Sequence, residues 1–143
     1  MFMGTFYNSI DSKNRMIVPA KFRNELGDRC VVTKGFDNCL NLYTVEEWKN
    51  EVKRMMTVPR NTAGYRAVLR KRTGDAAECE IDRQGRILIP AVLIAEAGFK
   101  KDLVTIGVVD SIEIWSKEVW ESPDNEAKLT DEEFTKAAEK FVF

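Results

Sequence analysis

"DSKNRMIVP" (residues 11–19) and "DRQGRILIP" (residues 82–90) have the same layout. In each stretch an aspartate precedes an arginine by four positions, and three apolar residues and a proline follow the arginine. The two stretches lie 71 positions apart (82 − 11) in a chain of 143 residues, which is about half its length. The pattern is therefore either a folding element used twice or a device that presents the same side chains twice.

The likeness between the two halves of the chain extends beyond these stretches. At an offset of 71, the further matches are Ile10 with Ile81, Pro19-Ala20 with Pro90-Ala91, Glu25 with Glu96 and Gly27 with Gly98. After a slip of one residue, Leu40-x-Leu42-Tyr43 matches Ile112-x-Ile114-Trp115, and Trp48 matches Trp120. Repetition of this kind indicates one supersecondary unit that occurs twice.

Local chemistry predicts the first elements of this unit. A short strand leads into each aspartate, and Asn14 or Gly85 supplies the turn, because both residue types tolerate positive φ. The β-rich residues after each arginine form a returning strand, and the proline ends it and suits the first position of a helix. The predicted ranges are strands 3–10 and 79–81, strands 15–18 and 86–89, and helices 19–26 and 90–97.

Each half then continues with a strand pair and a second helix. We predict strands 30–33 and 40–43 in the first half, and strands 103–108 and 111–115 in the second. Thr44 and Ser116 are suited to cap the short helices that carry Trp48 and Trp120. The predicted fold class is α+β, with two pseudo-repeat β-turn-β-α-β-β-α units. Because each unit is too thin to stand alone, we expect the units to pack into one pseudo-symmetric subunit.

Charge and pattern divide the chain into four segments. Residues 52–74 carry seven Lys or Arg and no acid, whereas residues 121–140 carry seven acids and three lysines. Helices are expected at 61–72, with Tyr65, Val68 and Leu69 on one face, and at 130–140, where Thr130-x-x-Glu133 is a capping-box pattern. The expected organisation is a first repeat (1–53), a basic connecting segment with a helix (54–75), a second repeat (76–121) and an acidic tail with a helix (122–143).

Composition excludes several classes of protein. The chain has no histidine, and it contains no glycine-rich phosphate loop or nucleophile motif. We therefore expect a protein that is not an enzyme and that has no cofactor, no metal and no small-molecule substrate. Three cysteines without CxxC spacing are expected to be reduced core thiols of a cytoplasmic protein: Cys30, Cys39 and Cys79. No apolar run approaches ~18 residues, so no membrane span is expected.

The repeated turns suggest binding rather than catalysis. A turn between strands projects its side chains, and arginine is the side chain that best reads the guanine edge in the major groove. The candidate DNA contacts are Arg15 and Arg86, with Lys13 and Arg83 assisting on the phosphate backbone. The aspartates, Asp11 and Asp82, would cap the turns. The alternative is that Asp and Arg only pair with each other to close the turn.

Two further features have more than one interpretation. The basic stretch 54–72 either contacts phosphates or is a solvated charged face. The repeated aromatic residues favour core or interface packing over base stacking: Tyr43, Trp48, Trp115 and Trp120. A net charge of -1 does not exclude DNA binding, because the local field matters more than the sum.

The chain resembles the MraZ family of bacterial transcription regulators. The resemblance covers nearly the whole chain and is carried by "MFMGTFYNSIDSKNRMIVPAKFR" (1–23), "DRQGRILIP" (82–90) and "IGVVDSIEIWSKEVW" (106–120). It implies a tandem of AbrB-like (SpoVT-AbrB) swapped-hairpin domains with an Asp-x-x-Gly-Arg signature. The signature positions are Asp11 and Arg15 in the first copy and Asp82, Gly85 and Arg86 in the second, with Asn14 in place of the first glycine.

The resemblance also implies a function. It is that of a nucleoid-associated regulator, expected to repress, that acts on its own operon, the division and cell-wall gene cluster. Its expected partners are promoter direct repeats in double-stranded DNA and further copies of itself in a ring-like homo-oligomer. The alternative function is an oligomeric protein-interaction scaffold or an antitoxin-like module that uses the same turns on an acidic protein.

Overall fold

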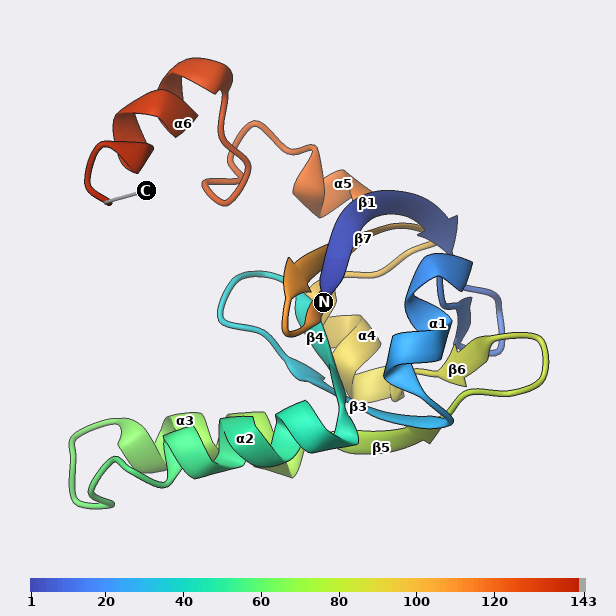
Figure 1. Cartoon of the computed structure of the whole chain (residues 1–143), viewed down its shortest axis with the longest axis horizontal. Coiled ribbons are helices and arrows are strands. Elements are labelled where there is room, and N and C mark those ends of the chain that lie inside the picture. Colours follow the sequence, from blue (N-terminus) through green and yellow to red (C-terminus); the bar gives the residue numbers. More distant parts are fainter. Residues whose placement is uncertain (142–143) are drawn as a thin grey trace.

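The order of elements repeats along the chain (Figure 1), and the computed structural model describes residues 1–141. The first half contains β1 (Phe2–Ser9), β2 (Arg15–Ile17), α1 (Ala20–Leu26), β3 (Arg29–Lys34), β4 (Leu40–Thr44) and α2 (Val45–Met55). After α3 (Tyr65–Gly74), the second half contains β5 (Ala77–Glu80), β6 (Arg86–Leu88), α4 (Ala91–Ala97), β7 (Asp102–Val109), β8 (Ile112–Ser116) and α5 (Lys117–Trp120). The tail contains α6 (Asp131–Ala138). Residues 142 and 143 of the predicted tail segment 122–143 lie outside the described residues.

The two halves exchange strands. A six-stranded sheet has the order β1-β7-β8-β4-β3-β5, and a second sheet pairs β2 with β6. If each strand is replaced by its equivalent in the other half (β1 by β5, β3 by β7, β4 by β8), the same order is read from the opposite edge of the sheet. A pseudo-twofold axis therefore passes between β4 and β8. The first strand of each half pairs with the third strand of the other half, β1 with β7 and β5 with β3. The α+β class and the swapped-hairpin arrangement are thereby confirmed.

The returning strand of each half pairs across the molecule rather than with the strand before its turn. In the first half, a single bridge between Ile10 and Met16 joins the two sides of the turn. The ladder partner of β2 is β6, in which Met16 lies opposite Ile87 and both side chains are fully buried. One core cluster contains buried residues of both halves. Neither half could bury these residues alone, as the thinness of the unit predicts.

Several predicted boundaries were wrong, and each has a local cause. α1 and α4 begin one residue after the prolines, because Pro19 and Pro90 keep extended backbone (ψ 131 and ψ 140) at the end of the preceding strand segment. The helix predicted at 61–72 begins at Tyr65, since the preceding residues form turns and Gly64 has φ 78. The helix that carries Trp48 is not short, because α2 continues for 11 residues.

The predicted caps and thiols are confirmed. The hydroxyl oxygen of Thr44 accepts from the Glu47 N–H at 3.0 Å, and that of Ser116 accepts from the Val119 N–H at 3.4 Å. Both halves of the capping box at Thr130 are present. The three cysteines are free and buried, and burial raises the pKa of Cys30 and Cys39 to about 12 and that of Cys79 to about 11. None of the helices within residues 1–141 has the length and apolar character needed to cross a lipid bilayer.

Arg72 joins α3 to the rest of the fold. Its side chain is 2% exposed; Nη1 donates to the carbonyl oxygen of Lys34, and Nη2 donates to the Tyr43 hydroxyl at 3.0 Å and the Glu51 carboxylate at 3.3 Å. The guanidinium also lies 4.6 Å from the ring centroid of Phe36. This arginine of the basic stretch is therefore neither a solvated charge nor available to phosphate, because rings and a carboxylate enclose it.

Replacing Arg72 by Ala is expected to reduce the free energy of unfolding by about 3 kcal/mol, because Glu51 loses a buried partner and the rings lose the cation. Urea unfolding followed by tryptophan fluorescence measures this loss. The matched control is Arg70→Ala, two positions away on the exposed side of α3, which should change stability by less than about 0.5 kcal/mol. Equal effects of the two substitutions would contradict the anchoring role.

Candidate nucleic-acid interface

The carboxylate of Asp11 closes the first turn. Its Oδ1 accepts from the backbone N–H groups of Lys13 and Arg15, each at 2.9 Å. Its Oδ2 accepts from Nε of Arg15, also at 2.9 Å. The Asn14 N–H donates to the Asp11 carbonyl oxygen at 3.1 Å. One carboxylate thus caps the turn and orients the arginine that follows it.

The second turn has the same geometry. Oδ1 of Asp82 accepts from the N–H groups of Gln84 and Arg86, and Oδ2 accepts from Nε of Arg86, all at 2.9 Å. The pairing of Asp with Arg therefore occurs in both copies, and it uses Nε. Within residues 1–141, the terminal nitrogens of Arg15 and Arg86 have no hydrogen-bond acceptor. Each guanidinium is held along one edge and open along the other.

These hydrogen bonds act on the ionisation of both aspartates. The backbone N–H of Arg15 is the largest cause that lowers the pKa of Asp11 from its ordinary value of 3.8. The N–H of Arg86 does the same to the pKa of Asp82. The hydrogen bond and charge of each arginine side chain act in the same direction. The carboxylates are therefore ionised, and the turns are closed, at neutral pH.

Asn14 and Gly85 adopt the same left-handed backbone, with φ 62 and φ 79. The carbonyl oxygen of each accepts from the other half: Val18 N–H donates to Gly85 at 2.8 Å, and Ile89 N–H donates to Asn14 at 2.9 Å. The two positions differ in their surroundings. A Cβ on Gly85 would lie 2.3 Å from Cζ of Arg23, whereas the position equivalent to Arg23 in the second half is Ile94. Asparagine therefore fits at the first turn, whereas at the second the Arg23 guanidinium would have to move aside.

The β2–β6 pair places the two arginines on one outer surface. Arg15 lies opposite Leu88, and Ile17 lies opposite Arg86, while Met16 and Ile87 between them point into the core. The arginines are thus diagonal and offset by two residues, roughly 7 Å along the strand direction. We call the outward side chains Arg15, Ile17, Arg86 and Leu88 the ribbon face. The side chains of Arg15 and Arg86 are 31% and 27% exposed, less than the projecting turns predict.

The structure adds two residues that the sequence argument did not consider. Ile17 and Leu88 are 51% and 60% exposed although both belong to apolar runs. The alternation of side chains along a strand could have identified them, because the residue after a buried Met16 or Ile87 must point outward. They give the ribbon face an apolar diagonal that crosses the diagonal of arginines.

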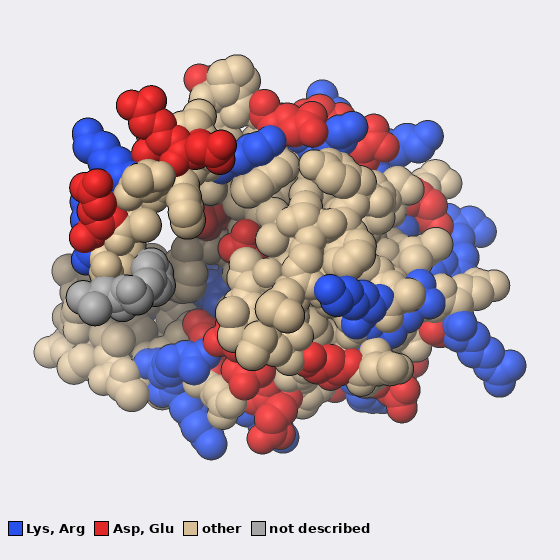
Figure 2. Space-filling view, turned by 45° about the horizontal axis from the view of Figure 1, so that its top comes forward, with Lys and Arg blue, Asp and Glu red and all other residues tan. Residues whose placement is uncertain are grey.

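Lys13 and Arg83 lie at the tips of the two turns. Both are exposed, and neither has an ion pair within residues 1–141. Both turn loops lie at the right-hand end of the molecule in Figure 1. Figure 2 shows Lys and Arg side chains gathered at that end, beside a smaller number of acids. The end that carries the turns is therefore locally basic although the chain has a net charge of -1.

Comparison with known proteins identifies the family. Residues 1–71 and residues 73–142 each match the family model described as "MraZ protein, putative antitoxin-like". The chain belongs to the MraZ family. The "Transcriptional regulator MraZ" of Thermoanaerobacter pseudethanolicus is 53% identical over 133 residues, 93% of both chains.

Two other relatives of the same name cover still more of the chain. The protein of Caldanaerobacter subterraneus subsp. tengcongensis is 50% identical over 139 residues, 97% of this chain and 95% of its own. That of Desulforamulus reducens is 46% identical over 142 residues, 99% and 98% of the two chains. At this level of description the chain is a transcriptional regulator, a class whose members are not usually enzymes. The separate match of each half also agrees with the repeat of elements along the chain.

Substitution of Gly85 by Asn is expected to reduce the free energy of unfolding by about 1–2 kcal/mol, because Arg23 must give up the hydrogen bond from its Nε to the Val18 carbonyl oxygen. The reverse change at the equivalent position, Asn14→Gly, is the control. It should alter stability by no more than about 0.5 kcal/mol, since relief of the left-handed asparagine offsets the entropy of glycine. Urea denaturation measures both, and equal losses would contradict the difference between the turns.

Asp82 should stabilise the folded protein at neutral pH and lose this effect in acid. Because its pKa is lowered by folding, the stabilisation is complete above the ordinary pKa of 3.8 and is lost as pH falls through the lowered value. Wild type and Asp82→Ala should therefore differ in urea midpoint at neutral pH and converge in acid. A difference that is constant or grows in acid would show that the carboxylate does not hold the turn.

Proposed function

We propose that the chain is a sequence-specific DNA-binding regulator, expected to repress its own operon, the division and cell-wall gene cluster. The observation that carries the proposal is the ribbon face, on which two arginines are fixed through Nε and keep their terminal nitrogens open. A two-stranded ribbon fits the major groove of DNA. A guanidinium donates two hydrogen bonds to O6 and N7 of guanine. The two arginine side chains are thus preorganised for this contact in the free protein.

The four candidate residues have two different tasks. Arg15 and Arg86 read base edges, because Asp11 and Asp82 limit the orientations that each guanidinium can adopt. Lys13 and Arg83 contact phosphates, since their exposed cationic side chains lie at the turn tips beside the ribbon. Asn14 and Gly85 act only through the backbone of the turn.

Ile17 and Leu88 extend the same proposal. Exposed aliphatic side chains beside a guanine-reading arginine can contact the methyl group of thymine. Their diagonal arrangement follows the same pseudo-twofold axis as the arginines. The ribbon face would then distinguish sites by both hydrogen bonds and apolar contacts.

The organisation of the chain is part of the proposal. Residues 1–53 and 76–121 form the two AbrB-like repeats, joined by the basic segment 54–75 and followed by the tail 122–143. Several copies in a ring would bind promoter direct repeats, because joined subunits add modest contacts through effective concentration. Such a protein acts in the cytoplasm, at the nucleoid.

The second candidate is a scaffold or antitoxin-like module that binds an acidic protein through the turns. The observation that supports this second candidate is the phrase "antitoxin-like" in the description of the matching family. Salt discriminates the two candidates, since release of counterions from DNA gives a steep decrease of log affinity with log salt. Binding to DNA that disappears with an equal excess of scrambled competitor would favour the second candidate.

Arg15→Ala and Arg86→Ala are each expected to weaken binding to the protein's own promoter by about 1–3 kcal/mol, roughly 5- to 150-fold. Lys13→Ala and Arg83→Ala should weaken specific and scrambled DNA alike and reduce the salt slope by about 1 each. Fluorescence anisotropy with labelled promoter DNA measures these effects. Lys136→Ala, an exposed cation on α6, is the control and should bind as wild type does. Undiminished affinity of the Arg15→Ala, Arg86→Ala double variant would refute the assignment.

A further inference from the structure

The helices α2 and α3 and the turns between them form a basic surface, which we call the basic hairpin (residues 45–74). They lie side by side and extend from the body (Figure 1). Four exposed cations there have no acidic partner within residues 1–141: Lys53, Arg60, Arg66 and Arg70. Three exposed aliphatic side chains lie among them: Met56, Val58 and Val68. The hairpin thus presents charge and apolar area that the chain itself leaves uncovered.

The segment after α5 presents the opposite charge, and we call it the acidic arm (residues 121–140). Seven acids in it form no ion pair with the described residues: Glu121, Asp124, Glu126, Asp131, Glu132, Glu133 and Glu139. No residue of α6 is buried, and Phe134 on it is 63% exposed. Figure 1 shows α6 extending from the body of the molecule. The arm is therefore an amphipathic element without a covered apolar face.

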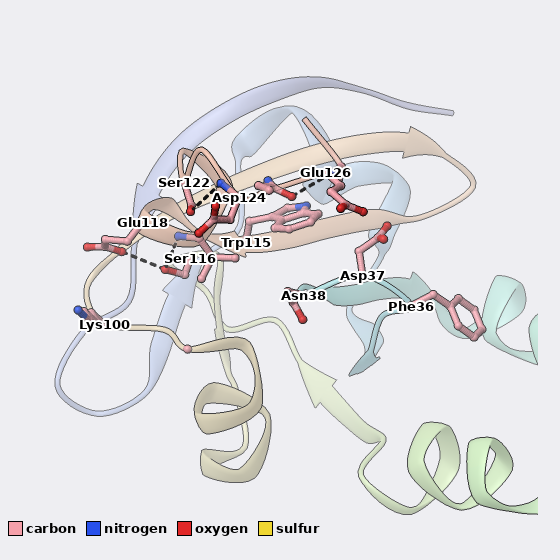
Figure 3. Close-up of a pocket in the computed structure, with 14 residues that line it drawn as sticks. Phe36, Asp37, Asn38, Lys100, Trp115, Ser116, Glu118, Ser122, Asp124 and Glu126 are labelled. Carbon is pink, nitrogen blue, oxygen red and sulfur yellow. Dashed lines mark hydrogen bonds between the residues drawn. The ribbon is translucent and has the colours of Figure 1, made fainter. Parts of the chain in front are cut away.

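A cavity of about 620 Å³ lies at the base of the arm, between it, α5 and the loop that joins β3 to β4. Trp115 lines it, and Asp37, Asp124 and Glu126 contribute carboxylates. In Figure 3 these carboxylates lie around the Trp115 ring. The Trp115 side chain is only 1% exposed and Lys100 also lines the cavity, so it is the three carboxylates that suit the cavity to a further cationic side chain.

The first half of the chain already holds an arginine in this way. The Arg72 guanidinium lies between 4.6 and 5.9 Å from the ring centroids of Phe36, Tyr43 and Trp48, with the Glu51 carboxylate at 3.3 Å. Tyr43 and Trp48 are the repeat equivalents of Trp115 and Trp120, whose ring centroids are 5.0 Å apart. In the second half Lys128, rather than an arginine, lies over the Trp120 ring, and the carboxylate-lined cavity lies beside the buried Trp115.

We propose that the basic hairpin of one subunit docks on the acidic arm of a second copy and that an arginine of the hairpin enters the cavity. The inference rests on the self-assembly proposed above and specifies its interface. A second copy is the occupant because both complementary surfaces belong to the same chain. Within a subunit, no ion pair or hydrogen bond joins hairpin to arm in residues 1–140. Such a heterologous contact joins subunits head to tail.

Charge reversal on each side tests the pairing. One variant carries Arg60→Glu, Arg66→Glu and Arg70→Glu; the other carries Asp124→Lys, Glu126→Lys and Asp131→Lys. Light scattering should show each variant alone as a monomer, because like charges face each other. An equimolar mixture should recover the wild-type assembly mass, since the reversed hairpin fits the reversed arm. A contact within one subunit would not respond to mixing.

The matched control reverses charges outside both surfaces. Lys13→Glu with Arg83→Glu should lose promoter binding and keep the wild-type mass, so that assembly and DNA binding are separated. A monomeric wild type would overturn self-assembly and the interface together. An assembled wild type with both variants also assembled would overturn the interface alone, as would dissociated variants that mixing does not rescue.

Salt gives a measurement that needs no substitution. The wild-type assembly should dissociate as NaCl concentration rises, because pairs of exposed charges are screened within about 8 Å at physiological ionic strength and more closely above it. An assembly mass that is indifferent to salt would overturn the proposal even if a charge-reversed chain failed to fold. Circular dichroism and the urea midpoint of each variant identify such a failure.

Discussion

The pairing of β2 with β6 is the constraint on which the rest of this structure depends. Met16 and Ile87 meet there in the centre of the core, and each belongs to a unit too thin to cover it. The exchange of β1 and β5 between halves follows from the same need, because it closes one sheet over a shared core. The duplicated chain is thus a single folding unit, and neither repeat has a complete core of its own.

The same pairing also sets the ribbon face. Because neighbouring side chains on a strand point to opposite sides, burial of Met16 and Ile87 turns Arg15 and Arg86 outward. The aspartates then hold both guanidinium groups by Nε. Fold and site are therefore linked: residues that seal the core determine the spacing of the arginines, and the capping carboxylates determine their orientation.

The two repeats differ in the surroundings of the turn glycine position and of their paired aromatic residues. The Arg23 side chain of the first half lies against Gly85, whereas the equivalent residue of the second half is Ile94, and Asn14 takes the place of the glycine in the first turn. Arg72 lies among aromatic rings in the first half, whereas in the second half a carboxylate-lined cavity lies beside the buried Trp115. Pseudo-symmetry is thus kept in the hydrogen bonds of the turns, and broken beside Gly85 and at the two charged extensions. That asymmetry is what a head-to-tail assembly needs, since two identical ends could only meet each other.

The sequence by itself determined the repeat, the order of elements, the turn residues and the caps at Thr44, Ser116 and Thr130, because all of these depend on local chemistry. It also identified Asp-x-x-x-Arg as the feature that recurs. Only the tertiary structure decided that β2 pairs across the halves, that Ile17 and Leu88 share a face with the arginines, and that Arg72 is buried. Those facts depend on contacts between residues distant in sequence, which local propensity cannot specify.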